Sequence, residues 1–342
     1  MRTKLTKKQK KVQKKALKNA AFLMTILSTD VVAEFGAHYI NQGQSQADIY
    51  NQLYRPSTTL EGMNFHPTQD TVVRKSNSSF TRILQPFQKM FTPIGTLTFK
   101  PVSIPLFKMK IDIAEYPDEL EDTWHGFLAG EGIDRKAWPF WKWFIMKHVL
   151  PQSERDMEAL EVYAGVFADP DPGVAGEPGT SMNGMKKVRN DYVDAGRITP
   201  IATGAFAADD DDFCTQIEEF VNDMDKDLRR QPLVIQMGED FYSKYRRGRR
   251  TKYNVNYAQV GDLEAIEDYP NIKVAGRQSF GSDEVLIATP KWNWLNCQKR
   301  QKVANAFSLE NEDRKVKFYA DWWQGTGPII PEWVATNDLE LD

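Results

Sequence analysis

The sequence is poor in residues that bind metals or form covalent cross-links. It has two cysteines, Cys214 and Cys297, and four widely spaced histidines. A structural zinc site needs four Cys or His ligands at short spacings, and a disulfide framework needs more than two cysteines. We therefore expect no metal site and no cofactor held by such ligands, and we place the chain in a reducing compartment.

Long hydrophobic runs are also absent. No stretch approaches the ~18 consecutive apolar residues that a membrane-spanning helix requires. Charged residues make up 27% of the chain and are dispersed beyond the N-terminal region. The 342 residues are 41% hydrophobic and 12% aromatic, which is enough to bury a large core. These features predict a soluble, folded chain without a membrane segment.

The motifs of common enzymes are missing as well. The sequence has no G-x-S-x-G elbow, no G-x-x-x-x-G-K-[ST] phosphate loop, no H-E-x-x-H and no G-x-G-x-x-G after a strand. Pro328 follows the glycine pair of residues 325–327 and lacks the N–H group that phosphate binding uses. His125 and His148 are interpreted as packed side chains rather than as a base or a ligand. We predict that the chain is not an enzyme, and an active site assembled from distant residues is the open alternative.

Positive charge is concentrated in one segment. Arg2 and eight lysines precede the first acidic residue, Asp30, so the net charge of −3 leaves −12 for the remainder (−3 − 9). Such a basic tail is either a solvated arm or an arm placed against nucleic acid, whose phosphates attract mobile cations. Residues 20–27 resemble a signal peptide, but the basic region is too long and a small-x-small cleavage site is missing. The lysines are Lys4, Lys7, Lys8, Lys10, Lys11, Lys14, Lys15 and Lys18.

The segment after this tail is predicted to contain a long two-stranded excursion. Residues 1–62 read as an arm that becomes ordered only on another surface. Apolar and polar residues then alternate with period two over residues 95–100 and 107–113, which is typical of strands with one buried face. A two-stranded excursion over about residues 66–114 is the simplest geometry. An isolated hairpin is marginal in water, so the excursion needs a partner surface, in its own chain or in another. Phe107, Met109 and Ile111 are the side chains we expect to make that subunit contact.

Helical periodicity begins further along the chain. An apolar stripe over residues 137–148 predicts a helix that Pro151 stops, and Ser153 is placed as the N-cap of a second helix through Tyr163. Residues 168–184 read as a connecting loop. A short helix is expected from Met185 until Gly196 terminates it.

The second half of the chain is predicted to be mixed helix and strand. Residues 209–212 are four aspartates, which favour capping of a helix N-terminus over metal binding. The arginines of residues 246–250 complement a helix C-terminus or, as the alternative, form an anion or partner site. Short strands are expected at residues 233–236, 272–274, 285–288, 316–320 and 333–335.

Two tryptophans follow the strand at residues 285–288. Pro290 ends the hydrogen-bond ladder of that strand, and Trp292 and Trp294 then fall on the same face of an extended segment. They are candidates for packing or for a subunit contact. Segments that cannot be stable alone, together with the lack of a pocket motif, point to self-association.

The order of several segments resembles the major capsid proteins of tailed bacteriophages that share the HK97 fold, particularly a group from phages and prophages of Bacteroidetes-like hosts. The likeness covers residues 65–335. It leaves open whether assembly uses a separate scaffold protein or none. The segments are LTFKP (97–101), KID (110–112), YPDEL (116–120), WHGFL (124–128), WP (138–139), residues 156–165, NGMKK (183–187), ITPI (198–201), GSD (281–283) through ATPK (288–291), and VKFYAD (316–321).

The resemblance implies an α+β fold with named parts. These are an N-terminal arm at 1–62 with its basic tail at 1–19, an extended β-hairpin loop at 63–115, a peripheral domain with a spine helix at 116–195, and an axial domain at 196–315. Strands at 316–342 are expected to complete the peripheral domain.

The resemblance also implies a structural function. The chain is expected to self-assemble as hexamers and pentamers into an icosahedral head shell around a double-stranded DNA genome, with the lysine tail facing the DNA. Expected partners are further copies of the chain, the packaged DNA, a portal, and a scaffold or decoration protein. The expected location is the virion, and the host cytoplasm during assembly. A decoration protein and a nucleic-acid-binding protein that uses the tail are the alternatives.

Overall fold

The computed structural model describes residues 58–115, 143–253, 264–299, 307–312 and 315–341. The chain divides into two compact units. The larger unit holds residues 56–108, 156–299 and 323–342, and the smaller unit holds the remainder. The lysine tail and His125 lie outside the described residues.

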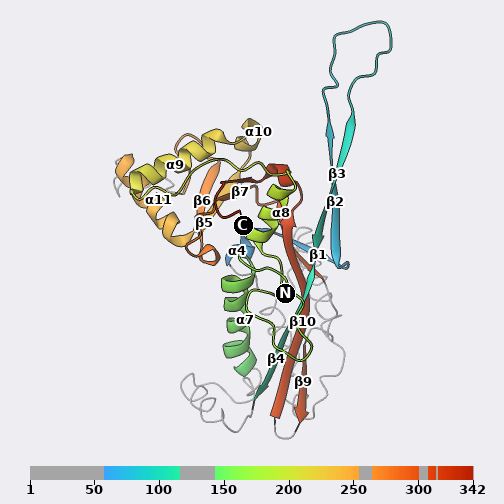
Figure 1. Cartoon of the computed structure of the whole chain (residues 1–342), viewed down its shortest axis with the longest axis vertical. Coiled ribbons are helices and arrows are strands. Elements are labelled where there is room, and N and C mark those ends of the chain that lie inside the picture. The colour runs from blue at the N-terminus through green and yellow to red at the C-terminus, as the bar shows by residue number, and fades with distance from the viewer. Residues whose placement is uncertain (1–57, 116–142, 254–263, 300–306, 313–314, 342) are drawn as a thin grey trace, which may run out of the picture. The chain divides into compact units, whose positions relative to one another are not determined.

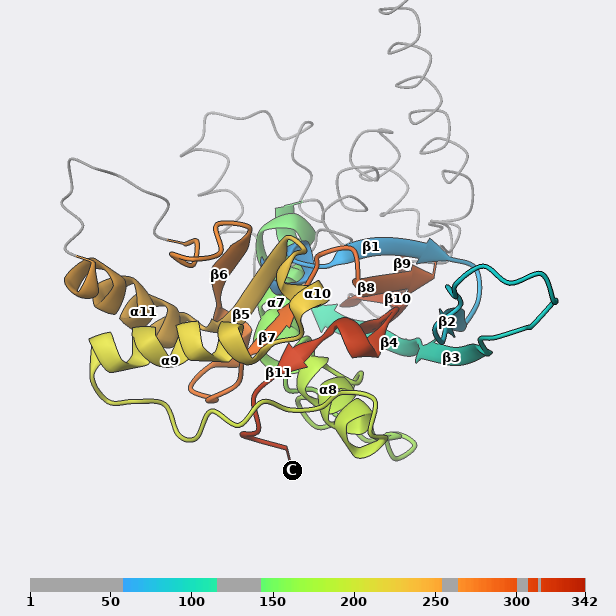
Figure 2. The ribbon, with the colours of Figure 1, turned by 90° about the horizontal axis from the view of Figure 1, so that it is seen from above.

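A four-stranded sheet forms the first core of the larger unit. Its order is β11-β7-β5-β6, where β5 is parallel to β6 and antiparallel to β7, and β7 is antiparallel to β11. Helices α9 and α11 lie side by side against one face of this sheet (Figure 1 and Figure 2). The strands are β5 (Leu233–Gly238), β6 (Ile272–Arg277), β7 (Ile287–Thr289) and β11 (Ala335–Thr336), and the helices are α9 (Asp210–Asp223) and α11 (Glu239–Lys252).

The predicted acidic cap of α9 is confirmed. The Asp209 side chain accepts hydrogen bonds from the backbone N–H groups of Asp211 and Asp212, at 2.9 and 3.4 Å. Three further carboxylates occupy the first turn, where the helix dipole favours negative charge. The apolar face of α9 supplies Phe213, Ile217, Phe220 and Val221 to the core. A short helix, α10 (Lys226–Arg229), follows and is capped in the same way by Asp225.

A second sheet in the larger unit contains β1 (Asn64–Thr68), β8 (Trp294–Lys299) and the end of β10 (Lys315–Pro328). β1 runs parallel to β8, and β8 is antiparallel to Gln324–Pro328 of β10. Trp294 is fully buried at the start of β8, and its indole N–H donates to Thr326 Oγ1 at 2.5 Å. Helix α8 (Met185–Asp194) packs on this core and ends, as predicted, before Gly196, whose φ is 66°.

Two buried polar groups fix the short helix α4 (Thr58–Glu61) and the segment that follows β11. The Thr59 hydroxyl donates to Glu158 Oε1 at 2.5 Å and lies 2.7 Å from the Ser279 hydroxyl. The guanidinium of Arg189 on α8 is fully buried. It donates to Thr336 Oγ1 at 3.4 Å and to the backbone carbonyls of Leu339 and Glu340.

The predicted two-stranded excursion exists, but it is shorter than expected. β2 (Val72–Phe80) pairs antiparallel with β3 (Leu97–Pro105), and residues 81–96 connect them at the tip. The next strand, β4 (Phe107–Glu115), does not belong to this ribbon and instead neighbours β10. Alternation of apolar and charged residues identifies a strand but not its partner, so the expectation of one excursion over residues 66–114 was wrong.

The described part of the smaller unit contains β4 from Met109 on, β9 (Phe307–Glu312), the first part of β10, and helical segments. β9 and β10 are antiparallel from Lys315 to Ala320. Helical backbone extends over η1 (Ile145–Val149), α7 (Leu150–Asp156) and, in the larger unit, η2 (Met157–Glu161).

Two helix boundaries predicted in this region were wrong. Pro151 does not stop the helix, because the wider π turn of η1 precedes it and the Leu150 N–H bonds to the Ile145 carbonyl. Ser153 lies inside α7 and is not a cap. Trp143, Phe144 and Ile145 are all buried, so burial here is not confined to a single helical stripe.

Other predicted elements are confirmed with changed boundaries. The strands expected at 233–236, 272–274, 285–288 and 316–320 correspond to β5, β6, β7 and β10. The strand expected at 333–335 is a 3-10 turn, η5 (Pro331–Trp333), followed by β11. A second 3-10 turn, η3 (Gln278–Phe280), precedes the loop into β7. Within the described ranges, none of the helices has the length and apolar character needed to cross a membrane.

We predict that Gly248→Ala destabilises the larger unit. A Cβ at Gly248 of α11 would lie 1.9 Å from the Asp210 carbonyl oxygen of α9, so the two helices would have to separate. Alanine gains about 1 kcal/mol of helix propensity, but displacing packed backbone costs more. We expect the free energy of unfolding in denaturant to fall by about 1–3 kcal/mol.

The matched control is Ser243→Ala on the exposed side of α11. It should change the free energy of unfolding by less than about 0.5 kcal/mol. If Gly248→Ala were as stable as this control, the close contact between α9 and α11 would be wrong.

Candidate interaction surfaces

Metal-binding side chains do not gather in the described residues. No group of three or more His, Cys, Asp or Glu side chains in those ranges could hold a metal ion. Cys214 and Cys297 are buried, and burial raises the pKa of each thiol to about 12. A thiol with so high a pKa carries almost no nucleophilic thiolate near neutral pH. His148 packs edge-on against Trp143, with ring centroids 4.8 Å apart.

The aspartate run and the arginine run contact each other. The Arg247 guanidinium lies 2.8 Å from Asp210 and lowers the pKa of that carboxyl. Arg249 pairs with Glu267 at 2.9 Å, and Arg250 donates to the Arg246 carbonyl. These contacts favour a structural role for the arginines over the anion site that was the alternative.

The β2–β3 ribbon has a buried base. Val73, Val102 and Ile104 pack with Leu295 and Cys297 of β8. Along both strands the side chains change from buried at this end to exposed toward the tip. The base therefore anchors the ribbon to the larger unit, and the tip receives no support from that core.

Two glycines of β10 allow the base to pack closely. A Cβ at Gly325 would lie 2.1 Å from the Pro105 carbonyl oxygen, and one at Gly327 would lie 3.1 Å from the Ile104 side chain. In the sequence, Gly325 and Gly327 were noted only because the proline that follows them excludes a phosphate-binding loop. In the structure the pair leaves room for the end of β3.

Charged contacts also hold the base. The Glu332 carboxylate accepts from Lys100 of β3 at 3.1 Å and from Arg197 at 3.1 Å. Arg197 donates in addition to the Pro101 carbonyl at 2.9 Å. Burial alone would raise the pKa of Glu332, but a backbone hydrogen bond and the two cations outweigh it and hold the pKa below 4.5. We call these contacts the Glu332 clamp.

The tip of the ribbon is strongly apolar and exposed. Nine of the fourteen exposed large apolar side chains of the described residues lie between positions 80 and 99. Phe87 is 93% exposed and Phe91 is 91% exposed. Figure 1 shows no helix or strand of the larger unit covering this end. The nine are Phe80, Ile83, Leu84, Phe87, Met90, Phe91, Ile94, Leu97 and Phe99.

Hydrogen bonds within the tip give it a defined shape without a core. The Gln85 amide donates to the Thr92 carbonyl at 2.7 Å, and the Gln88 amide donates to the Thr92 hydroxyl at 2.6 Å. Thr81 and Thr96 close the loop, with the Thr81 N–H donating to the Thr96 carbonyl at 3.1 Å. The apolar surface is thus presented on a closed loop.

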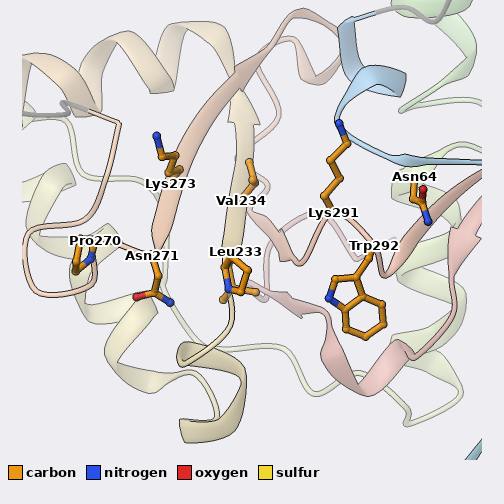
Figure 3. Close-up of a pocket in the computed structure, with 9 residues that line it drawn as sticks. Asn64, Leu233, Val234, Pro270, Asn271, Lys273, Lys291 and Trp292 are labelled. Carbon is orange, nitrogen blue, oxygen red and sulfur yellow. The ribbon is translucent and has the colours of Figure 1, made fainter. Parts of the chain in front are cut away.

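A groove lies where the chain enters β5 and β6 (Figure 3). Its floor is apolar, and Lys273 and Lys291 stand at its rim, with their side chains pointing to the same side in Figure 3. Trp292 is 40% exposed and packs at 61° against Trp333, with centroids 5.6 Å apart. We call this surface the Lys291 groove. Its lining is Asn64, Pro232, Leu233, Val234, Pro270, Asn271, Lys273, Lys291 and Trp292.

The residues expected to make subunit contacts are mostly turned toward their own chain. Phe107 packs on Phe167, with ring centroids 4.5 Å apart, Met109 is buried and Ile111 is half-buried. These three side chains belong to β4 and not to the ribbon. Trp294 is fully buried, so it serves packing, whereas Trp292 at the groove is exposed. Phe87 and its neighbours at the tip were missed because they lack the alternation by which strands were identified.

Comparison with known proteins gives a fold match. No protein-family model matches the sequence, and no curated protein does. A chain in the structure of the satellite phage P4 procapsid, which includes the size determination protein Sid, matches with a TM-score of 0.51 and 12% identity, over 95% of this chain and 97% of that one. A chain from the capsid of Myoviridae phage XM1 matches with a TM-score of 0.49 and 12% identity, over 91% and 94%.

The likeness to the procapsid chain shows the fold alone. The predicted α+β class is confirmed, and the chain has the HK97-like fold found in phage capsid structures.

We predict that Glu332→Gln loosens the base of the ribbon in a pH-dependent way. The folded pKa of Glu332 lies below its ordinary value of 4.5. The stability that the carboxylate contributes is therefore fully present above pH 4.5, and it is lost as the pH falls through the folded pKa. At pH 7 the variant should lose about 1 kcal/mol of protection against amide exchange in β3.

The difference between variant and wild type should disappear at low pH, where both side chains are neutral. Glu219→Gln, which changes an exposed carboxylate on α9, is the control and should not alter exchange in β3. A difference that stays constant from pH 7 to pH 3 would contradict the role of the carboxylate charge.

Proposed function

We propose that this chain is the structural subunit of a phage-type capsid shell. The observation that carries the proposal is the apolar tip of the β2–β3 ribbon, which is ordered by its own hydrogen bonds and exposed in the larger unit. The HK97-like fold supports the same conclusion. The function is mechanical, and the chain catalyses no reaction.

The energetics of the tip support burial against another subunit. Transfer of a phenylalanine side chain out of water contributes about 1.5–3 kcal/mol. A group of exposed large apolar side chains in one segment is typical of an interaction site. The ribbon is anchored at its base and projects its apolar residues outward, so a second copy of the chain is the partner that a repeating shell provides for it.

The finer features of the proposal come from the segment order of the sequence. They are assembly as hexamers and pentamers, an icosahedral shell around double-stranded DNA, association with a portal and a scaffold or decoration protein, location in the virion after assembly in the host cytoplasm, and kinship with the Bacteroidetes-type group. The division into arm, extended loop, peripheral domain and axial domain has the same basis. In these terms the ribbon corresponds to the extended loop.

We expect the purified chain to form shells or closed capsomers in electron micrographs, and the double variant Phe87→Ser/Phe91→Ser to lose them. Removing two exposed phenylalanines from an interface should weaken self-association about 100-fold or more. Sedimentation measures the association. At a concentration where both proteins are monomeric, the thermal unfolding temperature should not change, because both side chains are exposed in the subunit.

Phe65→Ser is the matched control, because Phe65 is 53% exposed on β1 and outside the ribbon. It should assemble as the wild type does. A wild-type chain that stays monomeric at all concentrations, and whose DNA affinity falls steeply with salt, would instead be the nucleic-acid-binding protein of the alternative hypothesis.

Deletion of residues 1–19 tests the proposed contact of the lysine tail with DNA. We expect shells of the deletion variant to retain less nucleic acid, because Arg2 and eight lysines are removed. The fold of the subunit should be unchanged by circular dichroism. Unaltered packaging and retention of DNA would contradict a role for the tail.

A further inference from the structure

The Lys291 groove has the chemistry of a site for an acidic, apolar segment. Leu233, Val234 and Trp292 supply the apolar surface, and two ammonium groups stand at the rim. Lys291 is exposed and forms no ion pair within the described ranges. The Asn271 amide is occupied by the chain itself, since it donates to the Arg229 and Gln231 carbonyls at 2.8 and 2.7 Å.

A loop of the same unit has the complementary character. Residues 169–177, which we call the acidic loop, carry Asp169, Asp171 and Glu177 and hold Val174 65% exposed near the middle. Within the described part of the chain, none of the three carboxylates takes part in an ion pair. The loop therefore presents negative charge around an apolar side chain, as the groove presents positive charge around an apolar floor.

The base of the acidic loop is firmly held. The buried Glu161 carboxylate accepts from the backbone N–H groups of Gly179 and Ser181, at 3.1 and 2.9 Å. The Val166 N–H donates to the Gly179 carbonyl at 2.8 Å, and the Ala168 N–H to the Thr180 carbonyl at 3.1 Å. Pro170 and Pro172 restrict the backbone beyond this base. A loop restrained in this way loses less entropy on docking.

We propose that the acidic loop of one copy docks in the Lys291 groove of the next copy. The inference rests on the proposed function, because a shell needs contacts that repeat from copy to copy. Loop and groove are different surfaces of one chain, so the contact is head-to-tail, and such contacts form a ring when the rotation between copies closes. Val174 meets the apolar floor, and the carboxylates of the loop face Lys291.

A single contact between the acidic loop and the Lys291 groove has low affinity, but several such contacts in a closed ring together give high affinity. Exposed ion pairs contribute little each, and the apolar area of one valine is small. Multiple simultaneous contacts in a closed assembly raise the total affinity without any new interaction. The charges mainly select the correct partner surface and speed the encounter.

Charge reversal of either side tests the pairing. Lys291→Glu and Asp171→Lys should each weaken self-association about 10-fold or more by sedimentation at low salt, because each variant places like charges opposite one another. The double variant Lys291→Glu/Asp171→Lys should recover. So should a 1:1 mixture of the two single variants, because the reversed loop of one variant then meets the reversed groove of the other, and the unchanged loop meets the unchanged groove.

Lys226→Glu is the matched control, since it makes the same charge change on an exposed lysine of α10, outside the groove. It should associate as the wild type does. Single variants that self-associate as strongly as this control would overturn the proposed pairing of loop and groove. Shells in the micrographs would still support the proposed function in that case. Single variants that fail to recover in the mixture and in the double variant also overturn it, since the groove then has another occupant. A monomeric wild type overturns both proposals.

Discussion

Burial at the base of the β2–β3 ribbon is the constraint on which the rest of the proposed interface depends. Two strands without a third cannot bury enough surface to be stable in water. Here Val102 and Ile104 enter a core built on β8, and Gly325 lets β10 approach the end of β3. The Glu332 clamp adds charged contacts at the same place. Only because this end is fixed can the other end present apolar side chains that the subunit does not cover.

Much of the fold could be predicted because its signals are local. Asp209 caps α9 through hydrogen bonds to residues two and three positions on, and Gly196 ends α8 with a positive φ, so neighbouring residues suffice to identify both. The prediction that Pro151 stops the helix was wrong, because the effect of a proline depends on the geometry of the turn before it. Strand pairing was the weakest prediction. β4 has the alternating pattern expected of a ribbon strand, but its neighbour in the sheet is β10.

The interaction surfaces were harder to predict for a related reason. Period-two alternation selected Met109, whose side chain faces its own chain, and passed over Phe87, which lies in a loop without periodicity. The available signal was a segment between two prolines, Pro86 and Pro93, that holds two phenylalanines and a methionine. Trp292 and Trp294 were expected on the same face of an extended segment. Trp292 is exposed and Trp294 is buried, because the backbone turns at residues 290–293. The groove and the acidic loop arise from tertiary packing and leave no motif.

The buried Arg189 has a consequence for the order of events during synthesis. Its guanidinium is satisfied by the carbonyls of Leu339 and Glu340 and by the Thr336 hydroxyl, about 150 residues further along the chain. Until the ribosome has released that segment, a cation in the core of the larger unit lacks its acceptors, and β11 is missing from the sheet. A growing chain therefore cannot complete the core of this unit before residues 336–340 have been synthesised.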